Sequence, residues 1–176
     1  MKKTLEVRDA ITGSHSERIK HLVVAIGKEL KVPEQMVFDL KLLAQFHDIG
    51  KVGIADRILF KPGPLTPEEF KEMQRHCEIG YRIALSSPDL CQIADLILRH
   101  HEWWNGQGYP LGLKEKDIPL ECRILALADA YDSMTTDRPY RKAITKQAAI
   151  EELAACSGKQ FDPEVFESFL GVFAGL

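Results

Sequence analysis

Apolar residues recur at helical spacing along most of this 176-residue chain, and two of the resulting stripes lead to a histidine. In residues 14–30 the stripe, followed back by one helical turn, reaches His15. A second stripe, in a helix opened by Pro33, leads to His47, and Gly50 fits the end of that helix. Both imidazoles are therefore expected to face inward, where a single histidine is more often a hydrogen-bonded core residue than a ligand.

Five further helices are predicted from caps and periodicity, since no segment alternates convincingly with period two. In the sequence LTPEEF, Thr66 is a suitable N-cap and Glu69 closes a capping box for a helix that ends near residue 85. The others are expected to begin at 87–88, near 118, after Thr145 and at Asp162-Pro163. Residues 52–65 and 102–119 are predicted to be irregular. We expect an all-α fold of about seven helices, forming one domain over residues 1–176.

Composition excludes several classes of protein. No apolar run approaches the roughly 20 residues that span a bilayer, and a net charge of −3 argues against a polymeric nucleic-acid partner. The four cysteines are widely scattered without a C-x-x-C pair, at positions Cys77, Cys91, Cys122 and Cys156. Reduced, buried thiols in a cytoplasmic protein are favoured over disulfides or a zinc cluster.

Two pairs of adjacent polar residues point to a metal site. Neighbours on a helix point about 100° apart, so His47-Asp48 and His100-His101 converge only at a helix end, or around two ions. Asp48 is then the natural bridging carboxylate, and Asp129 adds a further oxygen. This ligand set of imidazole and carboxylate without thiolate argues against structural zinc and favours iron, manganese or a similar ion. Two such ions suit in-line displacement at phosphorus by a metal-held hydroxide.

Five separated motifs resemble, in order, those of the HD-GYP phosphodiesterases, a branch of the HD metal-dependent phosphohydrolases that hydrolyses cyclic di-GMP. They are HSER at 15–18, FHDIGK at 46–51, His76, HHEWWNGQGYP at 100–110 and ADAYDSMTTDRPYR at 128–141. The resemblance covers nearly the whole chain, and the ordered set is much more specific than an HD pair alone. It implies a single HD-domain-like helical bundle with a metal centre in the core.

The resemblance also implies roles for individual residues. One metal is held by His15, His47, Asp48 and Asp129, and the other by Asp48, His76, His100 and His101. Asp48 and Lys51 are the catalytic candidates, because Lys51 is similar to the family lysine that contacts the scissile phosphate. Substrate binding is implied for Lys51, Gly108, Tyr109, Asp132, Arg138 and Arg141. Members with a third metal have Glu where this chain has Ile11, so we expect two divalent ions, iron or manganese.

The loop after His101 leaves some roles open. Glu102 is expected either to orient a ligand or to form a solvated cap. Trp103 and Trp104 are expected to pack the loop down and not to stack on a base. Asn105 stands where the motif often has Asp, which removes a charge next to the site.

The function implied is hydrolysis of cyclic di-GMP to linear pGpG, and onward to GMP, by a hydroxide that two metals activate. Two alternatives stay open: a non-catalytic cyclic di-GMP receptor or protein-interaction module, and an HD phosphohydrolase for another nucleotide or cyclic dinucleotide. The resemblance suggests a regulatory or GGDEF-type signalling protein as partner. The first motif begins close to Met1, so the chain is read either as a piece of a longer signalling protein or as a separate partner of a regulator.

Overall fold

The computed structural model describes residues 14–137 and 142–174, and helices dominate it. Its α-helices are α2 (Ser14–Glu29), α3 (Glu34–Phe46), α4 (Asp56–Leu59), α5 (Pro67–Gln74), α6 (His76–Leu85), α7 (Ala94–Arg99), α8 (Leu120–Thr135), α9 (Lys146–Cys156) and α10 (Pro163–Ala174). The 3-10 helices are η1 (Ile49–Gly53), η2 (Cys91–Ile93) and η3 (Glu115–Asp117). Within these residues, extended pairing is limited to one isolated bridge between Ser157 and Phe161. The all-α prediction is confirmed.

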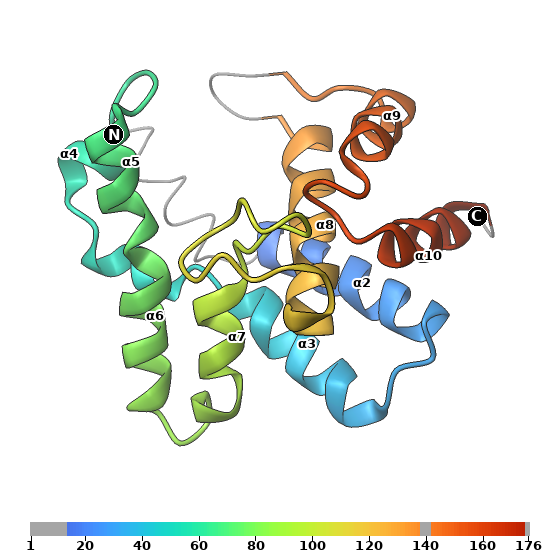
Figure 1. Ribbon diagram of the computed structural model, residues 1–176, viewed down its shortest axis with the longest axis horizontal. Helices are drawn as coiled ribbons and strands as arrows, with labels where there is room; N and C mark the ends of the chain where they lie inside the picture. The colour runs from blue at the N-terminus through green and yellow to red at the C-terminus, as the bar shows by residue number, and fades with distance from the viewer. Residues whose placement is uncertain (1–13, 138–141, 175–176) are drawn as a thin grey trace.

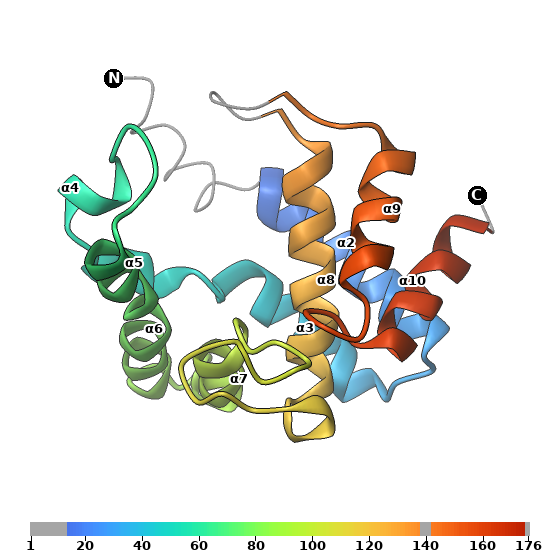
Figure 2. The ribbon, with the colours of Figure 1, turned by 45° about the horizontal axis from the view of Figure 1, so that its top comes forward.

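Helix α8 runs through the middle of the molecule (Figure 1). It packs against α2, α3 and α9, and α2 in turn packs against α3 and α10. Helices α9 and α10 lie on one side of α8, while α4, α5 and α6 lie on the other side, beyond α7 (Figures 1 and 2). The long loop between α7 and α8 passes close to α7 in both views.

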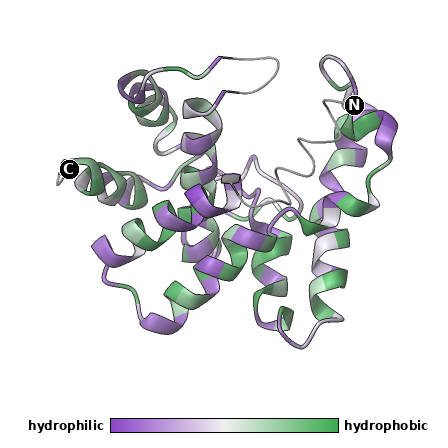
Figure 3. Cartoon of the chain, turned by 180° about the vertical axis from the view of Figure 1, so that it is seen from behind, coloured by the Kyte–Doolittle hydropathy of each residue, from purple (hydrophilic) through white to green (hydrophobic). Residues whose placement is uncertain are grey.

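The core is formed by the apolar faces of helices that are distant in sequence. Ile19, Leu43, Ile97, Leu127 and Phe169 are fully buried and come from α2, α3, α7, α8 and α10. Helix α10 is mainly hydrophobic along its length (Figure 3). No helix in the described part of the chain has both the length and the apolar character needed to cross a bilayer.

The predicted helix over 66–85 is in fact two helices. Thr66 caps α5 with the expected capping box to Glu69, but the chain leaves the helix at Arg75 and starts α6 at His76. The helix expected from 87–88 is replaced by η2 and the shorter α7. Helices α4 and η3 lie in segments predicted to be irregular, because four or three residues are too few to show a helical period.

Gly50 does not end its helix as predicted. Helix α3 ends at Phe46, and Gly50 lies inside η1, where it is buried against α6. A Cβ atom on Gly50 would lie 1.9 Å from the carbonyl oxygen of His76 and 2.5 Å from the amide nitrogen of Gly80. The glycine is therefore required by the close approach of η1 to α6.

The four cysteines are free, as predicted, but not all of them are buried. Cys77 and Cys122 are buried, Cys91 is exposed at the start of η2, and Cys156 is partly exposed at the end of α9. The prediction of buried thiols is thus wrong for Cys91 and holds only in part for Cys156.

Candidate metal centre

The histidines of the predicted centre stand at or near helix ends. His15 lies in the first turn of α2, His47 follows the last residue of α3, and His76 is the first residue of α6. His100 and His101 directly follow α7. The backbone changes direction at these ends, so neighbouring side chains can point at the same place, as the sequence argument required.

His15, His47 and Asp129 form what we call the first ligand group. Each offers one ligand atom, and these atoms all lie within 4.8 Å of one another. The Nε2 atom of His15 is 3.4 Å from Oδ1 of Asp129, which projects from α8. The stripes of α2 and α3 therefore bring their histidines to a carboxylate that lies 114 residues after His15 and 82 residues after His47.

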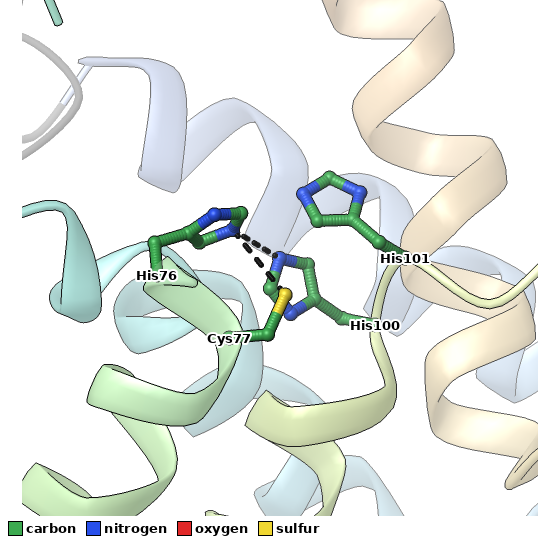
Figure 4. A group of neighbouring side chains, drawn as sticks. All are labelled: His76, Cys77, His100 and His101. Atoms are coloured by element: carbon green, nitrogen blue, oxygen red, sulfur yellow. Dashed lines mark hydrogen bonds between the residues drawn. The ribbon is translucent and has the colours of Figure 1, made fainter. Parts of the chain in front are cut away.

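His76, Cys77, His100 and His101 form the second ligand group, which satisfies the same 4.8 Å criterion (Figure 4). The Nε2 atoms of His76 and His100 are 3.4 Å apart, and the ring centroids of His100 and His101 are 4.0 Å apart. The two groups are adjacent, because the rings of His47 and His100 approach to 5.4 Å between centroids.

Asp48 lies between the two groups. Its Oδ2 atom is 3.6 Å from Nε2 of His47, and its Oδ1 atom is 3.6 Å from Nε2 of His76. Lys51, one turn of η1 further on, donates from Nζ to Oδ2 of Asp48 at 2.5 Å. Burial raises the pKa of Asp48, but the positive charge of Lys51, with smaller electrostatic contributions from the neighbouring imidazoles, outweighs this and holds the pKa well below its usual value. Asp48 is thus an ionised carboxylate with one oxygen toward each group.

Backbone carbonyls fix the tautomer of three imidazoles. The Nδ1 atoms of His47, His76 and His100 donate to the carbonyl oxygens of the residues three positions earlier, at 3.2, 2.8 and 2.6 Å. A carbonyl can only accept, so the proton of each neutral ring is on Nδ1 and the lone pair is on Nε2. In His76 and His100 these lone pairs face each other at 3.4 Å, an arrangement that a shared cation stabilises.

Burial keeps the second group uncharged. It lowers the pKa of His76 and, with the neighbouring imidazoles, lowers the pKa of His100 well below its usual value. Burial and His76 lower the pKa of His101 to about 3. These imidazoles are neutral at neutral pH, which is the form that binds a metal.

His15 is held by a different set of partners. Its Nδ1 atom donates to Oδ2 of Asp132 at 2.6 Å, and Arg18 donates to both oxygens of Asp132 at 2.5 and 3.0 Å. Burial lowers the pKa of His15, but hydrogen bonds to Asp129 and Asp132 outweigh it and raise the pKa to about 9. With Asp132 only 3% exposed and both of its oxygens occupied, these contacts favour a role in orienting His15 over the substrate contact that the resemblance implies.

The donor atoms of the centre suit divalent transition metals. Five imidazoles and two carboxylates come from five separate helix ends or faces, and the Nε2 lone pairs of His47, His76 and His100 are available to a metal. The chain therefore carries a cluster able to bind metal, as the sequence predicted.

Cys77 was missed by the sequence argument, which expected a ligand set without thiolate. Its Sγ atom lies 3.6 Å from Nε2 of His76. Burial raises the pKa of this thiol to about 12. The only indication in the sequence was its position directly after the predicted ligand His76.

Glu102 has neither of the roles considered for it. Its side chain is buried, and its two carboxylate oxygens accept the backbone N–H groups of Leu111 at 2.6 Å and Leu113 at 2.9 Å. Glu102 therefore ties the far end of the α7–α8 loop back to the start of that loop.

The middle of the same loop packs directly onto the second ligand group. The amide of Tyr109 donates to the carbonyl oxygen of His101 at 3.1 Å, and the two rings lie 4.8 Å apart. A Cβ atom on Gly108 would lie 2.2 Å from the amide nitrogen of Trp103, so only glycine permits this approach. On its outer side, Tyr109 contacts the half-exposed ring of Phe70.

The two tryptophans differ in their surroundings. The backbone amide of Trp104 donates to the carbonyl oxygen of Gln160 at 3.1 Å, and the guanidinium of Arg123 lies 5.8 Å from the centroid of its ring. Trp103 lines a cavity of about 190 Å³ together with His47, His100, His101, Asp129 and Gln160, among others. Asn105 accepts the amide of Gln107 within the turn. The cavity is therefore bordered by residues of both ligand groups.

Three positions discussed from the sequence, Ile11, Arg138 and Arg141, lie outside the described residues.

Known proteins resemble this chain over nearly all of its length. The HD-domain family matches residues 1–165. A cyclic di-GMP phosphodiesterase of Thermotoga maritima is 47% identical over 167 residues, 94% of this chain and 45% of the relative. The cyclic di-GMP phosphodiesterase response regulator RpfG of Xanthomonas campestris pv. campestris is 41% identical over 170 residues, 96% of this chain and 45% of the relative.

The fold is found in a solved structure as well. A crystal structure of a cyclic GMP-AMP-specific phosphodiesterase of V. cholerae superposes with a TM-score of 0.74 at 22% identity, covering 94% of this chain and 45% of that one. This chain thus spans less than half the length of the relatives and of the structure described here.

Proposed function

The chain belongs to the HD-domain family, and from this premise we propose that it is a metal-dependent phosphodiesterase that hydrolyses cyclic di-GMP to linear pGpG and onward to GMP. Relatives named as cyclic di-GMP phosphodiesterases support the substrate. The observation that carries the proposal is Asp48, an ionised carboxylate with one oxygen toward each of two adjacent ligand groups. From this position Asp48 would contribute one oxygen to each of two bound cations.

Bound in the two groups, a pair of divalent ions, iron or manganese, would supply Lewis acidity at phosphorus and activate water for in-line displacement. Asp48 holds the spacing of the two groups. Lys51, beside it, neutralises the negative charge that develops on the leaving oxygen. Asp132 keeps Nε2 of His15 directed at the first group.

Substrate binding is proposed for residues around this centre. Tyr109 and Gly108 lie on the loop that packs against His101, so they border the reacting phosphate. Arg138 and Arg141 are proposed to bind the phosphates, since a guanidinium offers two parallel N–H donors to a phosphate. A regulatory or GGDEF-type protein partner and a cytoplasmic location stay predictions.

The test is product chromatography on protein loaded anaerobically with Fe²⁺ or Mn²⁺. Cyclic di-GMP should be converted to pGpG and then to GMP, and Asp48→Ala should abolish turnover and bound metal together. Asp39→Ala removes a partly exposed acid on α3, away from the ligand groups, and is the matched control that should keep both. Turnover that survives in Asp48→Ala rejects the mechanism.

The same assay separates the alternatives. Tight binding of cyclic di-GMP without product, with metal present, would identify a receptor. Faster cleavage of a mixed cyclic dinucleotide or of a mononucleotide in a parallel panel would change the proposed substrate but not the proposed metal centre.

A further inference from the structure

Cys77 is fully buried, and its sulfur atom points into the second ligand group. Figure 4 shows Sγ on the same side as the Nε2 atoms of His76 and His100. The ligand atoms of these residues and of His101 all lie within 4.8 Å of one another. The other buried thiol, Cys122, instead donates to the carbonyl oxygen of Leu96 at 3.3 Å and has no imidazole partner among the described residues.

The separations in this group match those around one ion. With metal–nitrogen bonds of about 2.0–2.1 Å and a metal–sulfur bond of about 2.3 Å, two tetrahedral ligands lie about 3.4 Å apart for N···N and about 3.6 Å apart for N···S. The distance from Nε2 of His76 to Nε2 of His100 is 3.4 Å. The distance from the same Nε2 atom to Sγ of Cys77 is 3.6 Å.

We propose that Cys77 is a sulfur ligand of the ion that His76, His100 and His101 hold. As the ion binds, the S–H bond breaks, a metal–sulfur bond forms and the proton passes to solvent. The proposal rests on the metal binding of the proposed function but on no particular substrate.

A sulfur ligand makes the two metal positions chemically different. The first ligand group offers imidazole and carboxylate, whereas the second offers imidazole and a soft sulfur donor. Softer ions such as Fe²⁺, Co²⁺ and Zn²⁺ are therefore favoured at the second position over Mn²⁺, which prefers oxygen. Metal titrations should show a larger preference for Co²⁺ over Mn²⁺ at the second position than at the first, and equal preferences at both positions would count against the sulfur ligand.

The direct test is spectroscopy of the full chain loaded with Co²⁺. A sulfur-to-cobalt charge-transfer band in the near ultraviolet should appear in the unaltered protein, be lost in Cys77→Ser and persist in Cys122→Ser. Serine at position 122 can still donate to Leu96, which makes it a matched control. An unchanged band in Cys77→Ser would overturn the proposal.

X-ray absorption at the metal edge gives a second measurement that needs no variant. The unaltered protein loaded with Zn²⁺ should show a sulfur neighbour at about 2.3 Å. A coordination shell of nitrogen and oxygen alone would mean that the thiol only hydrogen-bonds His76, and the proposal would fail. Because this measurement uses the unaltered protein, it remains decisive even if Cys77→Ser does not fold. Product chromatography tests the proposed function separately from these two measurements. If the cobalt–sulfur band appears but cyclic di-GMP is not hydrolysed, the proposed phosphodiesterase activity is wrong and the sulfur ligand still stands.

Discussion

The Nδ1 atom of His15 lies 2.6 Å from Oδ2 of Asp132, and this contact joins the first turn of α2 to α8. Arg18 holds the same carboxylate through both of its oxygens. The imidazole is thereby fixed with Nε2 toward Asp129, in the arrangement by which a carboxylate orients a metal-binding histidine.

Asp132→Asn should weaken metal binding without preventing folding. The amide cannot pair with Arg18 and His15 as a carboxylate does, so the affinity of the first ligand group should fall by about 10- to 100-fold. Competitive metal titration measures the change, with Asp39→Asn, at a partly exposed position on α3, as control. An unchanged affinity would mean that His15 needs no orienting partner.

In metal-free protein, the charge on His15 should stabilise the fold in a defined pH window. Its pKa in the folded protein, about 9, lies above the ordinary value of 6.5. The stabilisation is therefore complete below pH 6.5 and is lost as the pH rises through 9, with an upper bound of about 3 kcal/mol. Denaturant midpoints in EDTA should differ more between the unaltered protein and His15→Gln at pH 6.5 than at pH 9.5. Equal differences at both pH values would contradict this assignment.

Gly50→Ala should be severely destabilising. The added Cβ atom meets the backbone of α6 at 1.9 Å, so η1 and α6 must separate, and Asp48 and His76 move with them. We expect a loss of about 3 kcal/mol or more in unfolding free energy, together with reduced metal content. Gly53→Ala is the control in the same 3-10 helix, because its Cβ atom meets only the side chain of Ile79, at 3.0 Å.

Glu102→Gln should loosen the α7–α8 loop and leave the metal centre intact. The amide retains one acceptor oxygen but turns an NH₂ group toward one of the two loop N–H groups. That buried N–H group loses its acceptor, which should destabilise the closed loop by about 1–3 kcal/mol. Hydrogen exchange should speed up at Leu111 and Leu113, and KM for the substrate should rise while metal content stays unchanged. Glu78→Gln, at an exposed position on α6, should alter none of these. Unchanged exchange at both amides would show that Glu102 does not hold the loop.

Lys51→Gln should lower kcat more than it alters KM. The variant removes the cation beside Asp48 that is proposed to stabilise the leaving oxygen, and one such electrostatic contact is worth about 100- to 1,000-fold in kcat. Steady-state kinetics at saturating metal checks this. A variant with full kcat would exclude Lys51 from the chemistry.

The parts of the structure that depend on local pattern were predictable from the sequence. The stripes of α2 and α3 indicated that His15 and His47 face inward, and the capping box of Thr66 and Glu69 placed the start of α5. The break at Arg75 was not predictable, because apolar residues recur at helical spacing on both sides of it.

The features that were missed depend on tertiary contacts. Cys77 reaches the imidazoles only because α6 packs beside α7, and Glu102 binds amides nine and eleven residues further along the chain. Neither contact produces a periodic pattern in the sequence, so neither could be predicted from the spacing of residues.

The candidate ligands are spread over most of the chain, and His15 and Asp129 of the first ligand group are 114 residues apart. Because His15 lies on α2 and Asp129 on α8, a cation held by both would form a non-covalent cross-link that closes this long loop, and a chain with α2 detached from α8 would lose one of its ligands. Metal binding at that position would therefore be thermodynamically linked to the packing of α2 against α8, and each would stabilise the other.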